Sequence, residues 1–188
     1  MDTTRHPYQL WIDLETTGLD ERTDVPLEVG LVLTDEQFEV VDTVSWVIYE
    51  NWFESGPISR MPDFVAKMHA DNGLLEECRL GGATISSIHS QMVDFVSSHG
   101  FTRSDPLCGS SVGFDRRFSE RYFPAFASTF SYRNVDVSSI KETVEKHRPD
   151  IAAKRDSMLT PLKMHRVVPD IADTVAEYFF YLKEFGLV

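Results

Sequence analysis

The chain has few cysteines and no long hydrophobic run. Cys78 and Cys108 are its only two cysteines, and they form neither a C-x-x-C motif nor a disulfide framework, so we expect buried thiols in a reducing compartment. The most apolar late stretch, residues 171–182, contains Asp173 and Glu177, and the first residues lack an apolar core. We therefore expect no secretion signal and no membrane span, which favours a cytoplasmic protein.

Positive charge is also scarce. Lysine and arginine number 18 against 30 aspartates and glutamates, which gives a formal net charge of -12. Tight binding of a long duplex normally needs a basic surface that displaces counterions, so this charge balance argues against it. It remains compatible with short nucleic acids and with a carboxylate cluster that needs divalent cations before it attracts phosphate.

The hydrophobic pattern predicts one α/β domain over residues 1–188, with a mixed sheet and helices on its faces. Strands are expected over residues 8–15, 27–35, 38–49, 105–110 and 132–137. Helices are expected over residues 62–80 (in two pieces broken near Asn72 and Gly73), 83–100, 113–123, 138–147 and 170–185. The first three strands form the simplest meander, and strand-helix units follow. Residues 148–164 lack clear periodicity and are expected to form a loop near the site.

Two carboxylates in the first strand are candidates for metal binding. Leu10, Ile12 and Leu14 alternate with Trp11, Asp13 and Glu15, which indicates a central strand with both carboxylates on one face. Their backbone positions would lie about 6.5 to 7 Å apart, so the two side chains can converge on one metal ion. A solvated strand face is the ordinary alternative, but adjacent carboxylates on a central strand repel unless something positive lies between them.

Three residues later in the chain extend this set. Asp115 follows a predicted strand and a small-residue turn, in the first turn of a helix, where a carboxylate that interacts only with the helix dipole is the common alternative. Asp170 follows His165 by five residues, with Pro169 where a loop should turn into the last helix. That spacing keeps His165 off the helical face of Asp170, so the imidazole can reach the site from a loop.

With these residues in place, the chain resembles a known family, the DEDDh exonucleases, and within that family it resembles oligoribonuclease. The resemblance is carried by WIDLETTGLD, CGSSVGFDRRF and HRVVPDIADTVAEYFFY, in that order, and by KMHADNGLLE and SYRNVDVSSIKE. It covers nearly the whole chain and implies a ribonuclease-H-like exonuclease fold. It also implies hydrolysis of very short RNA from the 3′ end to nucleoside 5′-monophosphates.

The resemblance further implies roles for individual residues. The metal ligands would be Asp13, Glu15, Asp115 and Asp170, and His165 would be the general base. Four carboxylates suit two hard divalent cations such as Mg²⁺ or Mn²⁺. A neutral imidazole can accept a proton from water at cellular pH.

Substrate contacts and a homodimer are implied in the same way. Leu19 and Phe64 correspond to family residues that wedge and stack the terminal bases. The other implied contacts are Ser111, Arg133 and Ser138 around the 5′ phosphate of a dinucleotide, His69 near the substrate, and Tyr132 at the active site of a partner subunit. Each position has an ordinary alternative: a turn serine, a surface arginine, a helix cap, an exposed helix histidine and a buried tyrosine at a strand end.

Two other functions stay open at this stage. One is a broader exonuclease on single-stranded DNA or RNA ends, similar to ribonuclease T or a proofreading subunit, which substrate-length preference would distinguish. The other is a catalytically silent nucleic-acid-binding module, which metal-dependent hydrolysis would exclude. The chain also departs from the family pattern at Ser110, at Phe114 where glutamine is frequent, and at Val168-Pro169, although its five catalytic positions are intact.

Overall fold

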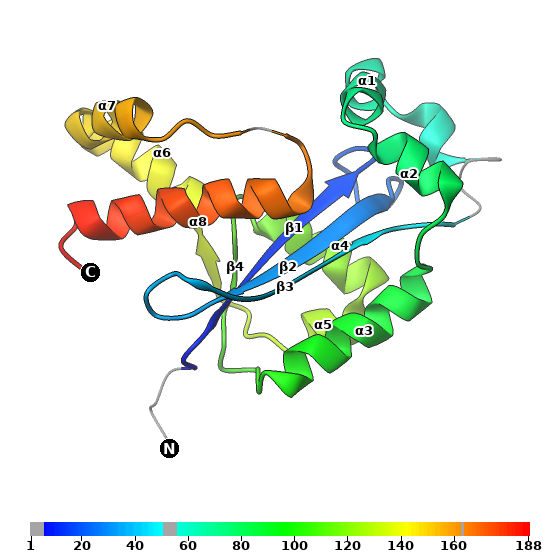
Figure 1. Ribbon diagram of the computed structural model, residues 1–188, viewed down its shortest axis with the longest axis horizontal. Coiled ribbons are helices and arrows are strands. Elements are labelled where there is room, and N and C mark those ends of the chain that lie inside the picture. The colour runs from blue at the N-terminus through cyan, green and yellow to red at the C-terminus, as the bar shows by residue number, and fades with distance from the viewer. Residues whose placement is uncertain (1–5, 51–55, 163) are drawn as a thin grey trace.

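The computed structural model describes residues 6–50, 56–162 and 164–188, and its centre is a five-stranded mixed sheet (Figure 1). The strands are β1 (Gln9–Thr16), β2 (Pro26–Thr34), β3 (Val40–Val47), β4 (Leu107–Gly109) and β5 (Asn134–Asp136). They lie in the order β3-β2-β1-β4-β5. The first three strands pair antiparallel, whereas β4 pairs parallel with both β1 and β5. The predicted meander and mixed sheet are confirmed, and β1 is the central strand.

The helices fall between and after these strands. They are the 3₁₀ helix η1 (Pro57–Arg60), α1 (Asp63–Asp71), α2 (Leu74–Leu80), α3 (Ile85–Ser98), α4 (Gly113–Tyr122), α5 (Pro124–Ala127), α6 (Val137–His147), α7 (Pro149–Met158) and α8 (Val167–Glu184). The break between α1 and α2 lies at Asn72 and Gly73, as predicted. Gly73 has a φ of 83°, a conformation that glycine adopts without steric cost.

The expectation of an irregular segment over residues 148–164 is wrong for its first part, because α7 occupies most of it. Pro149 opens this helix, at a position where its missing N–H is not needed. Only Ile151 and Arg155 are buried, so the sequence carries little apolar periodicity. Arg155 is held instead by polar contacts, through Nη1 to the Tyr181 hydroxyl at 2.8 Å and Nη2 to a Glu145 carboxylate oxygen at 3.0 Å.

The alternation of β1 places a separate hydrophobic cluster on each face of the sheet. Leu10, Ile12 and Leu14 pack with α3, α4 and α5, whereas Trp11 on the other face packs with α6, α7 and α8. Figure 1 shows these two helical layers on opposite sides of the strands. A third cluster joins α1 and α2 to Leu27 of β2. Because Asp13 and Glu15 share the face of Trp11, their side chains lie on the side that α8 covers.

Close contact between β2 and α8 brings the start of α8 to the site. Gly30 is the register partner of Asp13, and a Cβ atom at Gly30 would lie 2.6 Å from Val167 Cγ2. Any larger residue at position 30 would therefore push α8 away. The helix begins at Val167 rather than at the predicted Asp170, because a proline in the first turn, here Pro169, does not interrupt a helix.

The side of α8 that faces the sheet carries Ile171 and Val175, which are buried. Tyr178 and Phe179 are partly buried and lie against Trp11 and Phe38, respectively. Phe180 and Tyr181 are the buried residues of the later turns.

The two cysteines and the helix lengths were both subjects of prediction. Cys78 and Cys108 are both buried and free, as predicted. None of the described helices is long and apolar enough to cross a membrane. Residues 1–5, part of the segment in which no secretion signal was expected, lie outside the described residues.

Candidate active site

The carboxylates of β1 lie at the centre of the candidate site. Asp13 and Glu15 occupy the second half of the strand and are partly buried and buried, respectively. Glu15 is the register partner of Glu28 on β2, a third carboxylate on the same strand pair. The sheet thus holds several acidic groups close together, away from bulk water.

Asp115 is fixed against β1 from the next layer. It lies in the first turn of α4, as predicted, and is 2% exposed. Its Oδ1 accepts a hydrogen bond of 3.0 Å from the backbone N–H of Leu14, the residue between the two β1 carboxylates. This bond holds the Asp115 carboxylate against β1, at the residue that separates Asp13 from Glu15.

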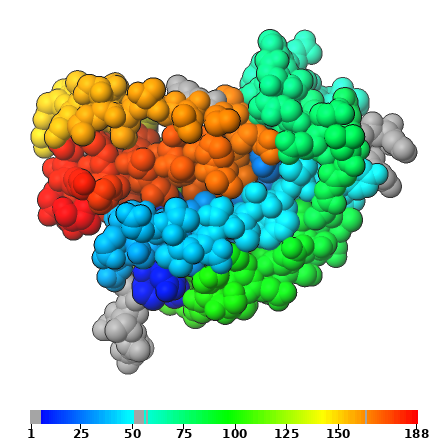
Figure 2. All heavy atoms as spheres, in the orientation of Figure 1, coloured from blue at the N-terminus to red at the C-terminus, as the bar shows by residue number. Residues whose placement is uncertain are grey.

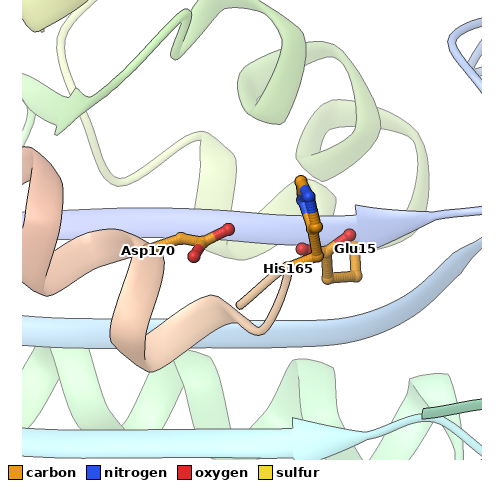
Figure 3. A group of neighbouring side chains, drawn as sticks. All are labelled: Glu15, His165 and Asp170. Atoms are coloured by element: carbon orange, nitrogen blue, oxygen red, sulfur yellow. The ribbon is translucent and has the colours of Figure 1, made fainter. Parts of the chain in front are cut away.

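His165 and Asp170 approach from the start of α8. Glu15, His165 and Asp170 each offer one atom that could bind a metal ion, and these three atoms lie within 4.8 Å of one another. Figure 3 shows the three side chains together, with Glu15 on β1, Asp170 on the first turn of α8 and His165 on the preceding loop. The structure therefore brings His165 to the carboxylates although it is exposed and 150 residues from Glu15 in sequence.

The crowding of these carboxylates raises their pKa values. Burial, followed by the charges of Asp170 and Glu28, raises the pKa of Asp13 to about 7. Burial, followed by the charge of Asp13, raises the pKa of Glu15 to about 8. Burial is also the main cause of the raised pKa of Asp115 and of Asp170. Like charges in a low-dielectric site cannot all ionise without a compensating cation.

The donor set fits divalent metal ions. Hard cations such as Mg²⁺ and Mn²⁺ prefer carboxylate oxygens. Asp170 Oδ1 is buried and has no hydrogen-bond partner among the described residues, which is costly unless a ligand satisfies it. Asp13, Glu15, Asp115 and Asp170 together would supply an oxygen-rich site that cations stabilise.

Sequence reasoning did not identify Glu28 as part of this cluster. Its side chain is 5% exposed, and its charge raises the pKa of both Asp13 and Glu15. The sequence did carry a signal, because Glu28 is the only charged residue within the otherwise apolar run PLEVGLVL. A single carboxylate inside a buried strand indicates a charged partner or a site.

A cleft adjoins the carboxylates and contains the two predicted base-contacting residues. Its volume is about 660 Å³, and Glu15, Leu19, Phe64 and Phe114 are among its lining residues. Leu19 is 80% exposed and Phe64 is 72% exposed. Large apolar side chains held in water beside an acidic centre are suited to stacking against a base.

His69 is fully buried, so the alternative of an exposed helix histidine is wrong. Its Nε2 donates to the carbonyl oxygen of Thr16 at 3.0 Å and lies 3.8 Å from Glu15 Oε2. Burial is the main cause of its lowered pKa. A neutral His69 therefore supports the end of β1, next to Glu15.

Two of the three residues predicted to bind a 5′ phosphate lie together. Ser111 Oγ and Ser138 Oγ are 3.2 Å apart, and Asp136 Oδ1 accepts from the Ser111 N–H and from Ser138 Oγ, each at 2.8 Å. Arg133 precedes β5, whereas Ser138 follows that strand. The structure thus groups the serines and places the backbone of Arg133 at the other end of the short strand.

Tyr132 is 82% exposed, so the alternative of a buried tyrosine at a strand end is wrong. The guanidinium of Arg133 lies over its ring, 5.4 Å from the centroid. An exposed aromatic ring next to a cation is available for a partner molecule.

Comparison with known structures and families identifies the class of protein. Escherichia coli exonuclease I, in a zinc-bound complex with single-stranded DNA, superimposes with a TM-score of 0.73 at 14% identity. The match covers 97% of this chain and 42% of that one, so this chain spans about two fifths of exonuclease I. The profile of a family described as Exonuclease matches residues 10–178. The fold and the family profile together define the class of this protein, a nuclease of the exonuclease class.

Sequence relatives place the chain more narrowly. It is 31% identical over 172 residues to the oligoribonuclease of Shewanella loihica, and the match covers 92% of each chain. It is also 31% identical over 185 residues to the oligoribonuclease of Acinetobacter baylyi, with 98% of each chain covered. The chain belongs to the exonuclease family and, within it, to the oligoribonucleases.

Proposed function

We propose that this protein is a 3′-to-5′ exoribonuclease that degrades short single-stranded RNA, dinucleotides above all, to nucleoside 5′-monophosphates. The observation that carries the proposal is the meeting of Glu15, His165 and Asp170 within 4.8 Å, beside Asp13 and Asp115. Phosphodiester hydrolysis needs a site that holds cations and a group that accepts a proton from water. In this cluster the carboxylates would hold the cations, and His165 would accept the proton.

Asp13, Glu15, Asp115 and Asp170 would hold two divalent cations, Mg²⁺ or Mn²⁺. When bound, such cations stabilise negative charge on the phosphate and the leaving oxygen and make water more acidic. The four carboxylates then keep their ionised form despite burial, because each has an opposite charge beside it.

His165 accepts a proton from the attacking water at an imidazole nitrogen. Its exposed position on the loop before α8 lets the ring reach solvent, while Glu15 and Asp170 stabilise the positive charge that the ring gains. Leu19 and Phe64 flank the bases of the substrate in the cleft, and buried His69 keeps the end of β1 in place. These contacts orient the scissile phosphate at the carboxylates.

Length selection is assigned to Ser111, Ser138 and Arg133. A cap on the 5′ phosphate measures length, because only a very short chain reaches the cap while its scissile phosphate lies at the carboxylates. The two serine hydroxyls, 3.2 Å apart, can both donate to one phosphate once they turn from their present partners. Arg133 supplies the positive charge, and its side chain has to reach from the far end of β5.

Tyr132 would complete the site of a second subunit in a cytoplasmic homodimer.

The test compares a 5′-phosphorylated RNA dinucleotide, the same dinucleotide with a 5′ hydroxyl, and a longer RNA strand, each with Mn²⁺ or with chelator. The phosphorylated dinucleotide is expected to be hydrolysed fastest, and only with metal. Ser111→Ala is expected to reduce the advantage of the 5′ phosphate about tenfold or more, since hydrogen bonds to charged groups contribute about 1.5 to 3 kcal/mol.

Ser139→Ala is the matched control, because Ser139 donates to the other oxygen of Asp136 at 2.7 Å and has no place in the proposed cap. It should keep the wild-type preference. Faster hydrolysis of the longer strand would favour a broader exonuclease, and equal rates with and without the 5′ phosphate would remove the cap.

A further inference from the structure

The backbone at His165 is in an unfavourable conformation. Its φ is 50°, in the left-handed region that costs a non-glycine residue free energy. Such a conformation persists only when surrounding contacts fix it. Asp170 bonds to the backbone of this loop, and two side chains outside the carboxylate cluster, Arg166 and Asn72, add further contacts.

Arg166 binds two carboxylates at once. Its Nε and Nη2 donate to the two oxygens of Glu28, each at 2.9 Å. Its Nη1 and Nη2 donate to the two oxygens of Glu77, at 2.9 and 2.8 Å. The side chain of Glu28 is 5% exposed and that of Glu77 is 46% exposed. The planar guanidinium thereby ties the residue after His165 to β2 on one side and to α2 on the other.

Asn72 holds the same loop from the turn between α1 and α2. Its Nδ2 donates to the carbonyl oxygen of His165, while its Oδ1 accepts from the backbone N–H of Leu74 at 3.0 Å. The amide is therefore used at both ends, and it acts on the peptide that links His165 to Arg166. Figure 2 shows the start of α8 in contact with the α1 and α2 helices.

We propose that Arg166 and Asn72 are positioning residues that hold the His165 imidazole at the carboxylates. The inference rests on the proposed function, in which His165 accepts the proton. Asn72 directly follows α1, the helix that carries Phe64, so its contact joins the end of a substrate-contacting helix to the loop of the proton acceptor.

The competing explanation is a purely structural ion pair. An arginine between two carboxylates could stabilise the fold without any effect on His165. A second explanation is a charge effect on the acidic cluster, to which any cation at position 166 would contribute equally. Arg166→Lys tests the charge explanation, because lysine keeps the charge and loses the planar fork, and the His165→Ala background tests the structural one.

The experiment measures kcat and KM for the 5′-phosphorylated dinucleotide with Mn²⁺, for Arg166→Lys and Asn72→Ala, each in the wild-type and in the His165→Ala background. In the wild-type background we expect kcat to fall about 10- to 100-fold, the usual cost of losing a contact that orients a site residue, while KM changes far less. In the His165→Ala background, measured in single turnovers, neither substitution should cause a further loss. Arg148→Lys is the matched control, since Arg148 pairs with Asp150 through the same two-bond geometry on an exposed surface.

A second readout is independent of activity. Histidine ring resonances recorded by NMR, with His165 assigned by its loss in His165→Ala, should shift or broaden in folded Arg166→Lys and Asn72→Ala. An equal loss of kcat in both backgrounds, or an unchanged ring signal with unchanged kcat, would overturn the proposal. A wild-type protein that does not hydrolyse the dinucleotide would refute the proposed function, and the ring signal would still decide whether these residues position His165.

Discussion

Asp13→Asn is expected to abolish hydrolysis and, at the same time, to raise the thermal stability of the chelated protein. The loss of activity follows because Asp13 is a proposed metal ligand, and stabilisation of several kcal/mol in the transition state corresponds to about a thousandfold or more in rate. The gain in stability follows because burial, and then the charges of Asp170 and Glu28, oppose the ionisation of Asp13. An asparagine of the same shape removes that repulsion.

The sign of the pH dependence follows from the raised pKa values. Asp13, with a pKa of about 7, and Glu15, with a pKa of about 8, keep protons in the folded state that the unfolded chain releases near pH 4. Their contribution to stability is therefore full below about pH 4 and is lost as the pH rises toward 8. In chelator, the wild-type melting temperature should fall over this range, and that of Asp13→Asn should fall less.

Differential scanning calorimetry at pH 5 and pH 8, in chelator and in Mn²⁺, checks this expectation. At pH 8 in chelator we expect Asp13→Asn to melt a few degrees above wild type, since 1 kcal/mol corresponds to about 2 to 4 °C for a chain of this size. Mn²⁺ should stabilise wild type much more than the variant. Asp150→Asn is the control, because the exposed Asp150 has a pKa lowered by Arg148 and should gain no stability when neutralised. A lower melting temperature for Asp13→Asn at pH 8 would contradict the proposed carboxylate repulsion.

His165→Ala is the second substitution with a large expected effect. Loss of a positioned proton acceptor typically costs about 10²- to 10⁴-fold in rate, and we expect kcat to fall within that range. Mn²⁺ affinity, measured by calorimetric titration, should stay close to wild type, because the proposed ligands are the four carboxylates. His147→Ala, an exposed histidine in the last turn of α6, is the matched control.

This experiment separates the effect of His165 on Mn²⁺ binding from its effect on turnover. The geometry places a nitrogen of His165 within 4.8 Å of oxygens of Glu15 and Asp170, a separation at which it could also serve as a ligand. A large drop in Mn²⁺ affinity in His165→Ala would therefore contradict the role of proton acceptor.

The sequence predicts those parts of the fold that depend on local periodicity. The alternation of Leu10, Ile12 and Leu14 with Trp11 is enough to identify a central strand, because only a strand covered on both faces buries both sets. The break at Asn72 and Gly73 is predicted for a similar reason, since a glycine at positive φ ends a helix. In α7, by contrast, the buried Arg155 contacts Glu145, Glu177 and the Tyr181 hydroxyl, which all lie outside the helix and which no pattern within it contains.

In the candidate site, too, some residues can be predicted from a local pattern and others cannot. Asp13, Glu15 and Asp115 are predictable because a carboxylate in or directly after a buried strand conflicts with its surroundings. The contribution of Arg166 is not predictable from the sequence, because it depends on Glu28 of β2 and Glu77 of α2. These partners lie about 90 to 140 residues away in the chain. His69 is another case, because its buried contact is with the carbonyl oxygen of Thr16, which lies 53 residues earlier in the chain.

The most direct test of the account is a time course of a short RNA of about seven nucleotides that carries a label on its 5′ end. In Mn²⁺ the wild-type protein should shorten the labelled strand one residue at a time from the 3′ end and release nucleoside 5′-monophosphates, whereas chelator or Asp13→Asn should leave the strand intact. Release of the labelled 5′ nucleotide as the first product, or hydrolysis that persists in chelator, would contradict a metal-dependent 3′-to-5′ exoribonuclease.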